Sequence, residues 1–195
     1  MLTGTELSVG YASAPALPRS AALPTSLQGT SVIVADSNWE RHAAGLFMVS
    51  PTEIRFQVPE GASEELAGVI VLRSGVESER LVIQLTAVAP GLFSANGVGR
   101  GVAAASAVRI ARNGTETPMD VARLEPALGR YLPVPLDLGE RSDRVYVRLH
   151  GTGIRRASGA RLATIRGNPV IVESSGPSLG VHGVDEVVLG PLPAH

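Results

Sequence analysis

Cysteine is absent from this 195-residue chain, which excludes disulfide bonds, catalytic thiolates and zinc sites built on cysteine. Long apolar runs are absent too, and none approaches the roughly 20 residues that a membrane-spanning helix needs. The first residues carry neither the basic region nor the apolar region of a signal peptide. We therefore expect no membrane insertion, and either an intracellular protein or a fragment whose export signal lies upstream.

A charge excess of either sign is also missing. The 17 Lys and Arg residues face 18 Asp and Glu residues, and the formal net charge is -1. Domains that grip nucleic acid through phosphates usually carry a basic excess, and helices that bind a membrane surface carry a basic face. The sequence has neither feature, so we expect no nucleic-acid partner.

Aliphatic and chain-turning residues are plentiful instead. The chain is 44% hydrophobic and 4% aromatic, with 22 Gly and 14 Pro, a mixture typical of short strands joined by turns. The clearest pattern lies in residues 45–59, where Ile54, Phe56 and Val58 alternate with polar residues. This period of two predicts a strand that follows an earlier strand and a tight break at Ser50-Pro51-Thr52.

Similar segments recur along the chain and predict an all-β protein. Strands of about five to eight residues at short spacing, without helical periodicity, favour β-sandwiches. The order of strands, turns and loops before Pro59 returns from Val145 onward. We therefore expect two sandwich domains, residues 1–90 and 91–195, with a Gly-rich link at 94–101. The repeat predicts that the second domain lacks its last two strands.

Four motifs carry a resemblance to a known family. They are Leu23-Pro-Thr-Ser-Leu-Gln-Gly-Thr-Ser-Val32, Val49-Ser-Pro-Thr-Glu-Ile-Arg-Phe-Gln-Val-Pro59, Ala89-Pro-Gly-Leu-Phe93 and Leu149-His-Gly-Thr-Gly-Ile154. In this order the motifs resemble the Solibacter-type C-terminal domain family, a group of uncharacterised bacterial modules similar to IPT/TIG immunoglobulin-like domains. The resemblance implies two tandem immunoglobulin-like sandwiches at the end of a larger exported or cell-surface protein, with no catalytic residues. Related sequences continue with two strands after the counterpart of residues 183–188, and those strands are missing here.

The sequence offers a few patterns of catalytic or binding chemistry. Gly176-Pro-Ser-Leu-Gly180 matches the Gly-x-Ser-x-Gly pattern, with His182 and Asp185 nearby. A hydrolase would need Ser178 on a strand-to-helix turn and the acid before the histidine, and neither condition is met. Gly97-Val-Gly-Arg-Gly101 could cradle a phosphate only if a helix followed, whereas Val108 and Ile110 indicate a strand.

Metal ligands are equally sparse. His42, His150, His182 and His195 are scattered, and we expect surface histidines rather than a zinc centre. Asp137, Glu140 and Asp143 could hold Ca²⁺, but the arginines between them favour salt bridges. We expect no catalytic residue, no cofactor and no metal.

Trp39 is the only tryptophan and lies in a polar turn beside Asn38 and Glu40. An exposed tryptophan can stack on a sugar ring, and it can also cover the open end of a sandwich. We expect a non-enzymatic spacer or adhesion-type module that meets a protein or glycan at the cell surface. The alternatives are a carbohydrate-binding accessory module of an extracellular enzyme, with Trp39 as the contact, and a serine hydrolase using Ser178.

Overall fold

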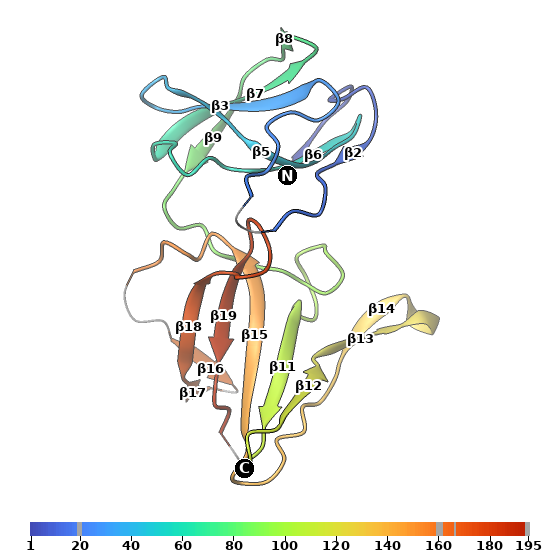
Figure 1. The fold of residues 1–195 in the computed structure, drawn as a ribbon, viewed down its shortest axis with the longest axis vertical. Coiled ribbons are helices and arrows are strands. Elements are labelled where there is room, and N and C mark those ends of the chain that lie inside the picture. The colour runs from blue at the N-terminus through green and yellow to red at the C-terminus, as the bar shows by residue number, and fades with distance from the viewer. Residues whose placement is uncertain (19–20, 159–161, 166, 194–195) are drawn as a thin grey trace. The chain divides into compact units, whose positions relative to one another are not determined.

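The computed structural model describes residues 1–18, 21–158, 162–165 and 167–193. The chain divides into two compact units, Met1–Ala87 and Val88–His195, whereas the sequence places the boundary after Pro90. The predicted all-β class is confirmed, because the described residues form antiparallel sheets and hairpins with one short 3-10 turn, η1 (Pro126–Leu128), and no α-helix. Figure 1 labels the strands as they are named below.

The first unit contains two antiparallel sheets. One sheet has the strand order β1-β6-β5-β2, and the other has the order β4-β3-β7-β8, with β9 also paired to β7. The strands of this unit are β1 (Leu2–Thr3), β2 (Ala12–Ser13), β3 (Thr30–Ala35), β4 (Arg41–Ala43), β5 (Gly45–Val49), β6 (Glu53–Gln57), β7 (Glu65–Arg73), β8 (Val76–Glu77) and β9 (Leu81–Leu85). The continuously apolar stretch around Val69 forms β7, which is central, as its composition predicts.

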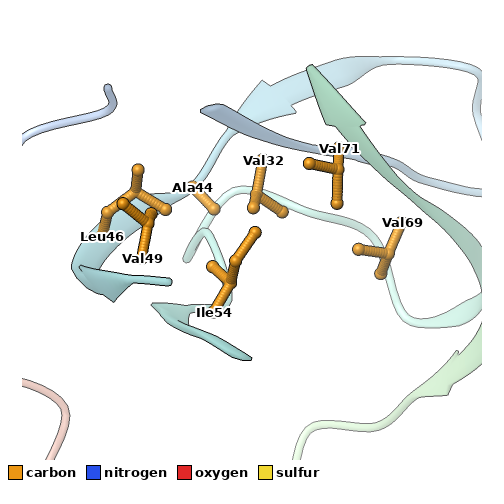
Figure 2. Packing of buried hydrophobic residues seen from close by; sticks show 7 residues of the cluster. All are labelled: Val32, Ala44, Leu46, Val49, Ile54, Val69 and Val71. Carbon is orange, nitrogen blue, oxygen red and sulfur yellow. The ribbon is translucent and has the colours of Figure 1, made fainter. Parts of the chain in front are cut away.

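A single cluster of buried aliphatic side chains joins the two sheets (Figure 2). Its members come from β3, β5, β6 and β7 and from the residue between β4 and β5, and they are Val32, Ala44, Leu46, Val49, Ile54, Val69 and Val71. Side chains from two sheet faces that meet in one core are the packing of a β-sandwich. The first unit is therefore sandwich-like.

The predicted hairpin at residues 45–59 is confirmed. β5 and β6 pair antiparallel, with Leu46 opposite Phe56 and Val49 opposite Ile54. The Ser50 hydroxyl closes the break, because it accepts a hydrogen bond from the Glu53 amide at 2.9 Å. Ile54 is fully buried and the polar Arg55 beside it is exposed, as the alternation predicts. The alternation does not extend to Val58, which follows the end of β6 and is 44% exposed.

The second unit contains one large sheet and two separate hairpins within the described residues. The sheet order is β12-β11-β15-β19-β18, and β10 pairs with β15. The strands are β10 (Gly91–Leu92), β11 (Ala105–Ile110), β12 (Glu116–Asp120), β13 (Ala122–Glu125), β14 (Arg130–Pro133), β15 (Arg144–Thr152), β16 (Ala163–Ile165), β17 (Asn168–Val170), β18 (Val172–Pro177) and β19 (Asp185–Leu189). The hairpins are β13–β14 and β16–β17.

Two segments of the second unit carry further sequence signals. Asn113-Gly114 predicts a hairpin with a return strand that contains residues 121–124, and the hairpin forms, but its return strand is β12, which starts at Glu116. The alternation from Leu132 to Leu138 includes two prolines, which cannot donate to a ladder and predict an edge strand or an extended flank, and the strand β14 ends at Pro133. Residues 94–101 form a loop inside this unit, which the Ala95 amide closes by donating to the Val102 carbonyl at 2.8 Å. The tandem of two sandwiches stays a prediction.

Candidate functional site

The loop between β3 and β4 presents the only tryptophan of the chain to solvent. The Trp39 side chain is 77% exposed. Its backbone has a φ of 64°, in the left-handed region that residues other than glycine rarely adopt. The Trp39 amide donates to the Asp36 carbonyl at 3.0 Å, so the turn closes in spite of this unfavourable φ. The structure thus holds an exposed aromatic ring on a defined turn, and we call residues 36–42 the Trp39 loop.

A buried carboxylate organises the Trp39 loop from beneath. The Asp36 side chain has no exposed surface. One carboxylate oxygen accepts hydrogen bonds from the amides of Asn38 at 3.0 Å and Glu40 at 3.1 Å. The other oxygen accepts from the Ser63 amide at 2.9 Å and lies 3.0 Å from His42 Nε2. A carboxylate with this many donors fixes the turn that carries Trp39.

These donors also set the ionisation of Asp36. The hydrogen bond from the Ser63 amide has the largest effect and lowers the pKa of Asp36 well below its usual value. Burial acts in the opposite direction, and the bonds from His42, Glu40 and Asn38 add to the lowering. The carboxylate is therefore ionised at neutral pH in spite of its burial.

The loop between β6 and β7 fastens the Trp39 loop from one side. Asn38 Nδ2 donates to Ser63 Oγ at 2.7 Å, and Ser37 Oγ donates to the Glu64 carbonyl at 3.3 Å. Together with the bond from the Ser63 amide to Asp36, these contacts tie two loops that are 27 residues apart in sequence. The position of Trp39 therefore depends on tertiary contacts and not on its own turn alone.

Arg80 supports the indole ring. Its guanidinium carbon lies 5.4 Å from the centre of the Trp39 ring, within the range of a cation–π contact. The Arg80 side chain reaches this place across Gly68 in β7, where a Cβ would lie only 2.3 Å from Arg80 Cδ. Gly68 is paired with Ala35 at the end of β3. A residue with no side chain therefore makes room for the arginine beside the loop.

The predictions for the histidines are partly wrong. His42 is not a free surface residue, since its side chain is only 20% exposed and contacts Asp36. His42 Nε2 also lies 3.9 Å from Glu40 Oε2, so three ionisable side chains meet at the base of the Trp39 loop. His150 is half-buried and lies 3.7 Å from Glu186. His195 lies outside the described residues.

The sequence names His42 only as one of four scattered histidines and does not group it with Asp36 and Glu40, because it does not predict β4 as a strand. β3 and β4 pair with Ala35 opposite Arg41 and Val34 opposite His42. Once this hairpin is known, the three residues must lie near one another across its turn. Its signal in the sequence is short, since β4 contains three residues and is not apolar.

The sequence does not meet the conditions for a catalytic serine at Ser178, and the contacts of Ser178 and Asp185 in the structure fit that expectation. Ser178 is buried, and its hydroxyl donates to Glu186 Oε1 at 2.6 Å. The buried Asp185 accepts from the amides of Ile154 at 2.7 Å and Arg155 at 3.0 Å, and from Arg155 Nε at 2.7 Å. A triad needs the serine to donate to a histidine that in turn donates to the acid. In this structure Ser178 bonds to Glu186, and Asp185 bonds to Arg155 and to the Ile154 amide.

The acids considered for Ca²⁺ and the Gly-rich loop also have structural explanations. The arginine that meets the acids is Arg109, 28 residues from Asp137, and not one of the arginines between them that the sequence favours. Arg109 donates to Asp137 and lies 3.8 Å from Asp143, so its positive charge stands between the acids proposed for Ca²⁺. The Gly139 amide and Arg109 lower the pKa of Asp137. The segment after the Gly-rich residues 97–101 is the strand β11, as predicted, so the loop is not followed by the helix that a phosphate site would use.

No family model, curated protein or solved structure matches this chain. The resemblance to the immunoglobulin-like bacterial family therefore stays a prediction. Among the described residues, no helix has the length and apolarity needed to cross a membrane. The fold is all-β, its first unit is sandwich-like, and the Trp39 loop of that unit displays an exposed aromatic side chain.

Proposed function

We propose that this chain is a non-enzymatic binding module of the adhesion type, part of a larger exported bacterial protein, whose first unit contacts its partner through Trp39. The observation that carries the proposal is the presentation of this ring. Trp39 is 77% exposed, its turn is fastened by a buried carboxylate, and Arg80 stands against it. Exposed Trp and Arg side chains held in place are typical of the residues that dominate binding energy.

The exported, immunoglobulin-like character rests on the resemblance of the four motifs, and the sandwich-like first unit supports it. A stiff sandwich separates its loops from its neighbours and can present them to a partner. In this proposal the first unit presents the Trp39 loop, and the second unit acts as spacer.

A carbohydrate-binding accessory module is the second candidate. Arg80 stands within cation–π range of the Trp39 ring, yet most of the tryptophan side chain remains exposed. An open indole face is a platform for a sugar ring, and the exposed Glu40 nearby could accept hydrogen bonds from hydroxyl groups. Protein and glycan partners would therefore use the same ring.

Binding of the purified chain to a glycan array and to bacterial cells distinguishes the two. We expect Trp39→Ala to lose binding at least about 10-fold, corresponding to 1.4 kcal/mol or more, because a central aromatic contact is removed. Tyr11→Ala is the matched control, since Tyr11 is also exposed, at 66%. Binding to cells but to no glycan favours a protein partner. Equal binding by Trp39→Ala and the wild-type chain would refute both candidate functions, the adhesion module and the carbohydrate-binding module.

A further inference from the structure

We propose that Asp36, Glu40 and His42 form a binding site for a divalent transition metal, with Zn²⁺ the best match, at the base of the Trp39 loop. This inference does not depend on the proposed binding function. The three residues offer two carboxylate oxygens and one imidazole nitrogen that all lie within 4.8 Å of one another. Three protein ligands with a fourth position open to solvent or a partner are a common zinc arrangement.

The distances between the ligand atoms suit a small ion. Zinc binds nitrogen and oxygen at roughly 2.0–2.2 Å, so two ligands of a tetrahedral ion lie roughly 3.3–3.6 Å apart. His42 Nε2 lies 3.0 Å from Asp36 Oδ2 and 3.9 Å from Glu40 Oε2, on either side of that range. The Glu40 side chain is 71% exposed, so it can turn toward the other two without disturbing the core.

The ion would replace the contact between Asp36 and His42. Asp36 Oδ2 and His42 Nε2 face each other at 3.0 Å. Metal binding requires a neutral imidazole and an ionised carboxylate. Since the two ligand atoms already face each other, an ion between them needs only a small increase in their separation.

The surroundings of Asp36 are those of a supported metal ligand. Carboxylates that bind metals are usually held by hydrogen bonds from a second layer of groups. Here the amides of Asn38 and Glu40 bind one oxygen, and the amide of Ser63 binds the other. These three bonds can persist while Oδ2 exchanges its contact with His42 for a bond to the ion, so the loop keeps its conformation.

The chemistry of the donors selects the class of metal. Imidazole suits Zn²⁺, Cu²⁺ and Ni²⁺, whereas Ca²⁺ takes six to eight oxygen ligands and Mg²⁺ demands an octahedral set rich in water. A site with one imidazole and two carboxylates therefore favours Zn²⁺, Cu²⁺ or Ni²⁺ over Ca²⁺ and Mg²⁺. Glu40 follows Trp39 directly in the chain, so an ion bound through Glu40 would engage the loop that carries the indole.

Zinc titration of the full chain, followed by calorimetry and by the fluorescence of Trp39, tests the proposal. We expect one zinc ion per chain, a change in Trp39 emission and a rise in melting temperature, since a ligand that binds only the folded state stabilises it. Ca²⁺ at the same concentrations should produce none of these effects.

Two variants and two controls make the test specific. Glu40→Gln should weaken zinc binding at least about 10-fold, because it removes one ligand, and His42→Ala should abolish it. Glu40→Gln leaves the hydrogen bonds of Asp36 intact, so its folding should match the wild type. The matched controls are Glu64→Gln and His150→Ala, which should bind as the wild type does. The proposal is refuted if the wild type shows no saturable zinc binding, or if Glu40→Gln and His42→Ala bind zinc as tightly as the wild type does.

Discussion

At the scale of single residues, Asp36 controls both the shape and the charge of the Trp39 loop. Hydrogen bonds from Ser63, His42, Glu40 and Asn38 lower its pKa below the ordinary value of 3.8. A group whose pKa is lower in the folded state contributes stability above the unfolded value and loses it as the pH falls toward the folded value. The pH window of this effect therefore opens at about 3.8 and extends downward.

Asp36→Asn tests this link. The variant should be less stable than the wild type at neutral pH, and its melting temperature should fall less steeply below pH 3.8, because it has no carboxylate to protonate there. Thermal unfolding followed by Trp39 fluorescence measures both effects. Asp120→Asn, at an exposed position, is the control and should keep the wild-type slope. A wild-type slope in Asp36→Asn would contradict the assignment.

Gly68 leaves the space in which the Arg80 side chain lies beside Trp39. Gly68→Ala places a methyl group 2.3 Å from Arg80 Cδ, and since the arginine is flexible it should move away and leave Trp39. We expect the same change in Trp39 emission in Gly68→Ala and in Arg80→Ala, with no further change in the double variant. The cost in stability should be about 0.5–1 kcal/mol, the value of an exposed cation–π contact. Gly176→Ala is the control, because its added Cβ meets open space.

At the scale of elements, the hairpin β5–β6 contributes Leu46, Val49 and Ile54 to the core of the first unit. Ile54→Ala should lower the free energy of unfolding by about 2–5 kcal/mol, because the side chain is fully buried and its removal leaves a cavity. Urea denaturation measures the change. Val58→Ala, four residues along at a site 44% exposed, should change it by less than about 0.5 kcal/mol. Similar losses at both positions would show that the core is not where the structure places it.

The second unit contains an ion pair between the partly exposed Arg155 and the fully buried Asp185. Asp185 is fully buried and binds Arg155 and two amides, and it holds the segment after β15 against β19. Asp185→Asn should cost about 1–3 kcal/mol, since it leaves buried amide donors and the Arg155 guanidinium with a weaker, uncharged acceptor. Urea denaturation followed by circular dichroism measures this loss, with Asp120→Asn as the exposed control. A loss below about 1 kcal/mol would contradict the role.

The elements were predictable where the signal is local. The alternation around Ile54 predicts one hairpin, and the turn residues Asn113-Gly114 predict another, because each of these signals is contained in a few consecutive residues. The Trp39 loop was predicted only as a polar turn. Its geometry comes from Ser63, Gly68 and Arg80, which reach it through pairing and contacts that no short pattern encodes. The exposure of Trp39 could be suggested from the sequence, but the residues that hold it could not.

At the scale of the whole molecule, the two units have different constructions. The first has two sheets around one aliphatic cluster, whereas the described part of the second has a single large sheet with two hairpins. The sequence predicts two similar sandwiches because its motifs repeat. Strand spacing alone does not say whether strands join one sheet or two, and this is why the finer architecture could not be predicted.

The most direct test of the central claim is photo-crosslinking from the Trp39 loop. A photoreactive amino acid at position 39 of the purified chain, incubated with the bacterial cells and glycans of the binding experiment, records what the ring touches. We predict one dominant adduct, protein or glycan, from position 39 and none from the same substitution at Tyr11. Equal adducts from both positions, or no adduct from position 39, would contradict a binding role for Trp39.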